Sequence, residues 1–506
     1  MKYLFIIPLF CLSGSLLASY PPEALKRLPQ QQLWLNTDNA AALRDTAVNR
    51  TEISASGILE SGAYRLPCSP SGKREINLST EGYHRTGSLS LYGKMNYEVG
   101  AGDNMRWKYE LLASPRNPFS FADSVAGHYD TERFAFDAAL AGSPAGGAFD
   151  YGIRVTYRTG SSAKNRDPRP LINGVRYSIR PGIAYRGKGW RAGLSLHAER
   201  YEEDIKVSLL DHLEVQRYFL FMGLGHAHRE LATEVSRDCN GENRGGSLQI
   251  GYENEKRQQL INLQFLSIKE GGTLGNAASP FKSGDYASQE MALLYLFKHY
   301  DGNRRSGCFR LALSRYDDRG LWYDQKSDPL KHDPPEWVVF NKSVKWTRQT
   351  ENWQTGYLYM KERQGGRDYT VGLSASFQRE KEEAYPNREK MEVRNLTLYA
   401  GADKTIYFRQ RNKLLVETEW SWRKNLSKEA QFGDIMLKEE ISYPLFGFRS
   451  ADYIHSKISI TFARSYHSAL HPFLRAAIDY KRVMDNNNRY ATQNRTRYEI
   501  AFGLLF

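Results

Sequence analysis

Apolar and polar residues alternate along most of this chain, and the alternation recurs many times with turn residues between the copies. A period of two places every second side chain on the same face of a strand, so each copy predicts a β-strand with one apolar and one polar face. The clearest copies run through 149–158, 190–197, 369–377, 414–423 and 498–506. They approach the roughly 9 to 11 residues that a tilted strand needs to cross a bilayer, whereas strands of soluble sandwiches have about 5 to 6. The pattern therefore predicts a transmembrane β-barrel with a lipid-facing apolar side and a lumenal polar side.

The last copy of the pattern ends on the final residue of the chain. Tyr498, Phe502 and Phe506 share its apolar face, while Arg497 and Glu499 share the other face. An aromatic last residue in this setting resembles the C-terminal signal by which bacterial barrel proteins are handed to the barrel assembly machinery. We therefore expect Tyr498, Phe502 and Phe506 to form an assembly signal, with that machinery as a partner.

We expect an all-β, antiparallel barrel of about 18 strands, within a range of roughly 16 to 20, because single-chain bacterial barrels have even strand numbers. The expected spans lie near 74–82, 86–99, 129–141, 146–158, 173–186, 189–203, 245–256, 258–268, 286–299, 305–316, 338–349, 352–363, 367–380, 393–409, 412–424, 453–467, 470–484 and 494–506. Long connections near 99–129, 203–245 and 268–286 read as extracellular loops. The connection near 316–338 falls on opposite sides when it is counted from the two ends, so one strand is misplaced or missing. Residues 52–60 are the candidate for an extra first strand.

The sequence pattern predicts that the chain has three parts. Residues 1–18 read as a secretory signal peptide, because a basic start is followed by a short apolar run and small residues. We expect residues 19–66 to form an N-terminal periplasmic or lumenal segment and residues 67–506 to form the barrel. Within the first segment, 37–43 read as a helix N-cap followed by a short helix, which makes this segment a candidate plug.

Composition narrows the class of protein. The mean hydropathy is −0.60, and after the signal no stretch approaches the roughly 18 apolar residues of a transmembrane helix, so a helical membrane protein is excluded. Aromatic residues make up 13% of the chain, which fits aromatic girdles at the bilayer surfaces. The net charge of +13 favours anionic surfaces, which for such a barrel are lipopolysaccharide and other outer-membrane lipids. We expect these lipids as partners and no nucleic acid.

The cysteines predict no zinc site, and we expect no metal centre and no cofactor. Removal of a signal peptide takes Cys11 away and leaves Cys68, Cys239 and Cys308, an odd number that permits at most one disulfide. The spacings match no zinc-binding pattern. Whether Cys239 and Cys308 pair is open.

Five charged residues fall on the polar faces of expected strands: Arg154, Glu199, Glu417, Glu419 and Arg423. We expect them to face the lumen. There they line a water-filled channel or cross-link a closed interior, and the sequence leaves both readings open.

Asp167, Pro168, Arg169 and Pro170 form a stiff turn, because each proline fixes its own backbone angle and restrains the residue before it. One reading is purely structural. The other is a loop folded over or into the lumen that presents Arg169 to an anionic group or a neighbouring carboxylate.

Candidates for catalysis are few. Asp211 with His212, and Ser465 with His467, have no evident partners for acid, base or nucleophilic chemistry. His226 and His228 could share one face of a strand, but no third metal ligand is evident nearby. The sequence favours a protein without catalytic activity.

Between about 115 and 200 the chain resembles an uncharacterised Bacteroidota outer-membrane β-barrel family. The stretches that carry the resemblance are 122–127, 155–158, 166–170 and 196–198. Members of that family are often associated with TonB-dependent receptors, which implies nutrient uptake at the outer membrane of a Gram-negative bacterium. We expect passage or capture of a small solute, by the barrel alone or as an accessory to a TonB-dependent receptor. The alternatives are a surface hydrolase, either protease or phospholipase, and a structural or assembly partner with a plugged lumen.

Overall fold

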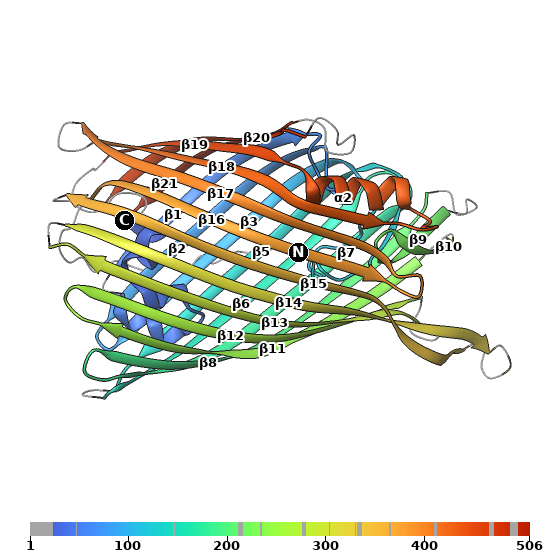
Figure 1. The fold of residues 1–506 in the computed structure, drawn as a ribbon, viewed down its shortest axis with the longest axis horizontal. Coiled ribbons are helices and arrows are strands. Elements are labelled where there is room, and N and C mark those ends of the chain that lie inside the picture. Colours follow the sequence, from blue (N-terminus) through green and yellow to red (C-terminus); the bar gives the residue numbers. More distant parts are fainter. Residues whose placement is uncertain are drawn as a thin grey trace, which may run out of the picture.

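The structure is a computed structural model of the 506-residue chain. It describes residues 24–46, 48–144, 147–210, 216–232, 235–275, 280–302, 304–328, 330, 336–363, 366–408, 412–464, 470–485 and 494–506. These residues form one closed barrel with further elements inside it (Figure 1).

Eighteen antiparallel strands make the wall, and each pairs with the wall strands before and after it. They are β1 (Arg50–Gly62), β2 (Gly72–Thr86), β3 (Leu89–Met105), β5 (Gly127–Gly142), β6 (Phe149–Lys164), β7 (Arg169–Arg186), β8 (Trp190–Ser208), β11 (Val235–Glu253), β12 (Arg257–Leu274), β13 (Phe281–Tyr300), β14 (Arg305–Asp328), β15 (Glu336–Arg363), β16 (Gly366–Ala384), β17 (Glu389–Phe408), β18 (Asn412–Gln431), β19 (Tyr453–Arg464), β20 (His471–Val483) and β21 (Asn494–Leu505). The last strand pairs with the first along Glu52 to Gly62, which closes the cylinder. The prediction of an all-β antiparallel barrel of about 18 strands is confirmed.

Two details of the predicted strand order are wrong, and they cancel in the count. The expected spans 338–349 and 352–363 are one continuous strand, β15, which extends far beyond the membrane-facing part. The missing strand is β1, so the barrel begins at Arg50 and not at residue 67. Its outward face includes Ala55 and Gly57 beside Ile53, and such small residues weaken the alternation in the sequence. The single strand β15 removes the parity conflict near 316–338, and β1 places the start of the barrel wall beside the end of its last strand.

An apolar band surrounds the outside of the barrel. Its members, on strands around the barrel, include the exposed side chains of Ile153, Val155, Leu194, Leu248, Phe265, Leu373, Ile460 and Ile500. Cross-strand aromatic pairs border the band, with ring centroids 5.3 Å apart for Phe149 and Tyr185 and 5.9 Å apart for Trp353 and Phe377. Such rings suit the boundary between lipid and water.

The two ends of the barrel differ. At one end, here the turn end, consecutive strands are joined by short connections such as 187–189 and 254–256. At the other, here the loop end, the connections 106–126, 209–234 and 432–452 are long. Long connections exceed what a strand reversal needs, so they are free to fill the lumen or to bind.

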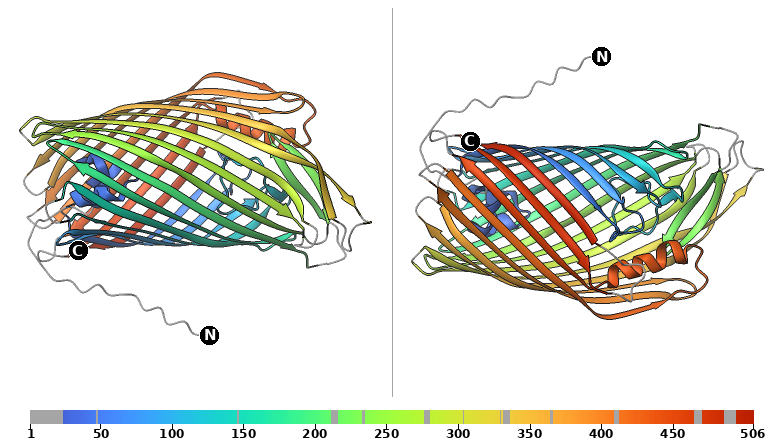
Figure 2. Two further views of the ribbon diagram at one scale, coloured as in Figure 1. Left: turned by 90° about the horizontal axis from the view of Figure 1, so that it is seen from below. Right: turned by 90° about the horizontal axis from the view of Figure 1, so that it is seen from above.

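Elements inside the barrel occupy both ends (Figure 2). The helices α1 (Ala24–Gln31), η1 (Leu33–Asn36) and η2 (Ala40–Asp45) lie at the turn end. At the loop end, β4 (Phe121–Asp123), β9 (Gln216–Gly223) and β10 (His226–Ala232) form a three-stranded sheet, beside η3 (Lys438–Ser442) and α2 (Tyr443–Ser450). Among the described residues, no helix has the length and apolar character needed to cross a bilayer.

Candidate functional site

The N-terminal segment 24–46, here called the plug, lies against a row of lumen-facing glycines. A Cβ added to Gly152 would lie 2.5 Å from the backbone carbon of Ala40, and one added to Gly182 would lie 2.2 Å from the Asn39 side chain. A Cβ added to Gly193 would lie 3.0 Å from the Trp34 ring, and one added to Gly251 would lie 2.9 Å from it. Contacts this short exclude any larger residue, so the wall is shaped to hold the plug.

Polar contacts fix the position of the plug. The Asn39 side chain caps η2 by accepting from the Ala41 N–H at 3.0 Å, and its amide donates to the Ile183 carbonyl at 3.0 Å. Arg191 of β8 binds Asp45 with both terminal nitrogens, and Arg180 of β7 lies 3.1 Å from Asp38. The helix expected within 37–43 therefore exists and begins after Asn39.

Apolar contacts extend the plug across the turn end. Leu28 packs against Leu505 of the last strand, and Leu43 packs against Ala139 and Ala141 of β5. Trp34 is buried with Leu260 and Leu296 of β12 and β13. The plug thus reaches strands on several sides of the lumen and closes much of this end.

The segments 106–126, 216–232 and 432–451, here called the cap, fill the loop end. Their apolar side chains form one buried cluster with the wall. Its members from the cap include Trp107, Tyr109, Phe119, Phe121, Tyr218, Leu220, Phe221 and Leu437, and those from the wall include Tyr129, Ile172, Ile205 and Trp322. A cluster with so many aromatic rings stabilises the cap as a folded unit inside the barrel.

Two carboxylates of the wall hold the first cap segment by its backbone. Glu203 of β8 accepts from the N–H groups of Leu111 and Leu112 at 3.0 and 2.6 Å. Glu270 of β12 accepts from the Ser114 N–H at 3.1 Å and from the Asn117 amide at 2.9 Å. Hydrogen bonds to ionised acceptors are stronger than those between neutral groups, so these carboxylates act as latches.

A chain of alternating charges connects the cap with strands β13 to β16. Arg116 of the cap binds Glu290 and lies 3.4 Å from Asp318. Asp318 is fully buried and also lies 3.3 Å from Arg348. The chain ends at α2, where Arg449 lies 2.7 Å from Glu380 and 2.6 Å from Glu382. The two separate cap segments are therefore tied to the same part of the wall.

Glu110 lies within the cap, where its carboxyl group is buried. Burial raises the pKa of Glu110 from 4.5 to about 7, although Lys108 and Arg237 oppose the rise. The closed cap holds this proton more tightly than an open cap does. Protonated Glu110 therefore stabilises the closed cap fully below pH 4.5, and this stabilisation is lost as the pH rises through 7. A pKa rise of this size corresponds to a stabilisation of the closed cap by about 3 kcal/mol at most.

We therefore expect amide exchange of the segment 107–120, corrected for its intrinsic pH dependence, to be faster at pH 8 than at pH 5. Glu110→Gln removes the ionisation and should make the corrected rates similar at the two pH values. Wild-type rates that do not differ would show that Glu110 does not control the cap.

The structure places all five predicted lumen residues on inward faces, where their partners differ. Arg154 binds Asp137 at 2.5 Å, and Glu199 lies 3.4 Å from Arg176. The remaining arginine, Arg423, donates to the Ala451 and Phe448 carbonyls at 2.9 and 3.0 Å and so supports the cap. Glu417 and Glu419 lie on the face of β18 opposite to the exposed ring of Trp420, and Glu419 is exposed.

The stiff turn lies at the loop end between β6 and β7. Arg169 donates to Asp167 at 2.7 Å, and the Leu210 N–H donates to the same carboxylate at 3.1 Å. Pro168 precedes the first residue of β7, and Pro170 is buried in that strand beside Val207. The guanidinium of Arg169 therefore already has a carboxylate partner, and the turn connects two strands.

The three residues of the expected assembly signal lie at the barrel seam. Tyr498 and Phe502 point outward from β21 and are 51% and 56% exposed. Phe506 exchanges two backbone hydrogen bonds of 2.8 and 2.9 Å with Thr51. Its role in assembly stays a prediction.

Cys68, Cys239 and Cys308 are free thiols, so Cys239 and Cys308 do not pair. Within the described ranges, no group of three His, Cys, Asp or Glu residues could hold a metal ion. His226 belongs to strand β10 and lies 3.5 Å from Glu389. The pairs at 211–212 and 465–467 lie outside the described residues.

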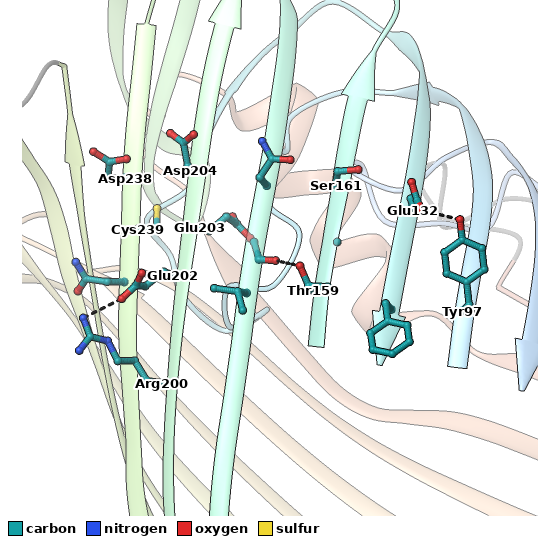
Figure 3. Close-up of a pocket in the computed structure, with 16 residues that line it drawn as sticks. Tyr97, Glu132, Thr159, Ser161, Arg200, Glu202, Glu203, Asp204, Asp238 and Cys239 are labelled. Atoms are coloured by element: carbon teal, nitrogen blue, oxygen red, sulfur yellow. Dashed lines mark hydrogen bonds and ion pairs between the residues drawn. The ribbon is translucent and has the colours of Figure 1, made fainter. Parts of the chain in front are cut away.

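A polar groove of about 710 Å³ lies on the outer wall at the loop end (Figure 3). Its side chains include Glu132, Thr159 and Glu202. They alternate with inward residues along their strands, so they lie on the same outward faces that carry the apolar band. Arg200 pairs with Glu202, two residues further along β8, at 2.8 Å. These outward side chains turn the groove toward the surroundings of the barrel, and its lining also includes the buried Glu203 and Cys239.

A model of the family of unknown function DUF6850 matches residues 40–506. The chain belongs to the DUF6850 family. The matched region includes η2 of the plug and every strand of the barrel. The bacterial phylum implied by the resemblance at 115–200 stays a prediction. No curated protein matches this DUF6850 chain.

Solved structures with a similar barrel share little sequence with the DUF6850 chain. The ferric preacinetobactin receptor BauA of Acinetobacter baumannii is 7% identical, covers 90% of this chain and 79% of its own, and has a TM-score of 0.39. The ferric yersiniabactin uptake receptor FyuA of Yersinia pestis is 9% identical, with 91% and 80% covered and a TM-score of 0.42. For the RagAB peptide transporter the identity is 7%, the coverage 90% and 86%, and the TM-score 0.41.

Proposed function

We propose that this chain is a bacterial outer-membrane barrel that passes or captures a small solute, with the plug and the cap as the two gates of its lumen. In this proposal the turn end faces the periplasm and the loop end faces the outside, as in other bacterial barrels. Outer-membrane lipids and lipopolysaccharide surround the wall, and the barrel assembly machinery inserts it. The barrel works alone or as an accessory to a TonB-dependent receptor, the context implied by the sequence resemblance.

The observation that supports this proposal is a lumen that the chain itself fills in large part at both ends, with exposed polar side chains on the wall between them. Tyr399 faces inward from β17 and is 40% exposed, and the side chains of Arg133 and Arg497 are each 42% exposed. A barrel of this strand number is wide enough for an aqueous path unless something fills it. A purely structural barrel has no need for a solvated lumen wall that is closed by two separate segments.

We expect the intact protein to conduct ions only weakly in planar bilayers. Deletion of residues 24–46, or Gly152→Leu in the wall that holds the plug, should raise the single-channel conductance at least about threefold, because either change leaves the turn end open permanently and ions then pass whenever the cap opens. The matched control is Gly93→Leu, since a side chain at Gly93 meets nothing within 4 Å.

Large, stable currents from the intact protein would instead identify a general pore. No current from the intact protein or from either plug variant would favour a structural or assembly partner with a filled lumen. A surface hydrolase stays the other alternative, and hydrolysis of phospholipid or peptide by the purified barrel would support it.

A further inference from the structure

Four arginines from two neighbouring strands face the lumen between the plug and the cap. Arg154 of β6 lies directly opposite Arg180 of β7, and Arg158 lies directly opposite Arg176. All four alternate with outward apolar residues such as Tyr157, so they share the lumenal face. The two pairs are separated by one inward position on each strand, which makes them a single block of guanidinium groups, here called the arginine quartet.

Like charges directly opposite each other on adjacent strands destabilise a sheet, so two such pairs need compensation. Three carboxylates supply part of it: Asp137 for Arg154, Glu199 for Arg176 and Asp38 for Arg180. Arg158 is exposed to the lumen and has no hydrogen-bond or ion-pair partner in the described part of the chain. The quartet thus holds one positive charge more than its carboxylates neutralise.

A second feature of the same wall also lacks a partner. His197 of β8 lies next to Arg180, is only 8% exposed, and neither of its ring nitrogens has a hydrogen-bond partner. The buried Nε atoms of Arg176 and Arg180 are unpartnered as well. Buried polar atoms normally have partners, so several unpartnered donors on one wall indicate a place for a ligand with acceptor oxygens.

We propose that the arginine quartet, with His197, is a binding site for an oxyanion, the carboxylate or phosphate group of a small solute. The planar guanidinium group matches both groups with paired N–H donors, which a lysine cannot do. This inference rests on the proposed function and names the chemical class of its solute.

The quartet also contacts both gates. Arg180 holds Asp38 of the plug, and Arg176 donates to the Leu112 carbonyl of the cap at 2.5 Å. An anion that takes these donors competes with Asp38 and Leu112. Because a ligand shifts an equilibrium toward the state that it binds better, the bound anion favours release of the plug and the cap.

The test is binding of inorganic phosphate and of succinate to the full-length barrel in detergent, measured by calorimetry at low salt. The wild-type barrel should bind at least one of them, and the one that binds identifies the phosphate or the carboxylate as the recognised group. Arg158→Gln should weaken that binding at least about tenfold, since it removes the unneutralised charge. The matched control is Arg315→Gln on the outer wall, where Arg315 is paired with Asp317 at 2.9 Å, and it should leave the affinity unchanged.

Amide exchange gives a second readout on the same samples. Saturating anion should speed exchange of the plug residues 33–46 in the wild type and in Arg315→Gln, but not in Arg158→Gln. A wild-type barrel that binds neither anion would overturn the proposal without any variant, and so would equal affinity in Arg158→Gln. Solute passage without anion binding would contradict the anion site and leave the proposed function standing. Anion binding in a barrel that never conducts would support the anion site and contradict passage through the lumen.

Discussion

We expect a chain with Phe506→Asp to reach the membrane as assembled barrel at about one tenth of the wild-type level or less, because the change removes the aromatic end of the expected assembly signal and puts a charge on the outward face of the closing strand. The last strand makes the seam with β1, and the hydrogen bonds between Phe506 and Thr51 are the final ones of that seam. An aspartate at this position places a charge where the outward face of Tyr498 and Phe502 continues toward the bilayer surface.

The measurement is the amount of heat-modifiable, protease-resistant protein in purified outer membranes. Phe506→Tyr is the control, since it keeps an aromatic ring at the end of the strand, and it should assemble at the wild-type level. Deletion of Phe506 should resemble the aspartate variant. Normal levels of the aspartate variant would show that neither recognition nor closure depends on this residue.

The barrel could be predicted from the sequence because alternation is a property of each strand by itself. Each inward residue predicted to line the lumen, from Arg154 to Arg423, has the expected orientation for this reason. The errors arose where a strand departs from the average. The 28 residues of β15 exceed a membrane span and were divided in two, while β1 carries too many small residues on its lipid face to stand out.

The gates could not be predicted, because they depend on contacts across the lumen. The sequence shows glycines at 152, 182, 193 and 251 on polar faces, and their recurrence near the same end of four strands is a signal that was available. What lies against them is set by the path of the plug. Likewise Arg154 and Arg180 are far apart in sequence, and only the strand register makes them direct neighbours. The long connections were recognised as loops, but their inner sheet and buried cluster were not.

Arg116→Met should loosen the cap strongly. Arg116 is the residue of the first cap segment that enters the charge chain, where it contacts Glu290 and the fully buried Asp318 and lies over the Tyr316 ring at 4.4 Å. Methionine fills similar space but leaves Glu290 without this partner and Asp318 with one cation fewer. Removing one member of a mostly buried ion pair costs about 3 kcal/mol, and the partial exposure of Arg116 reduces this to about 2 kcal/mol.

A loss of about 2 kcal/mol increases the open fraction of the cap about 30-fold, because each 1.4 kcal/mol corresponds to a factor of ten. Amide exchange of residues 107–120 should therefore accelerate by about this factor, while Arg315→Gln on the outer wall should leave it unchanged. Conductance should rise little in Arg116→Met alone, because the plug still closes the turn end, and should exceed that of the plug deletion when the two changes are combined. Unchanged exchange at 107–120 would show that Arg116 does not hold the cap. Full conductance from Arg116→Met alone would show that the cap is the only barrier and that the plug does not close the path.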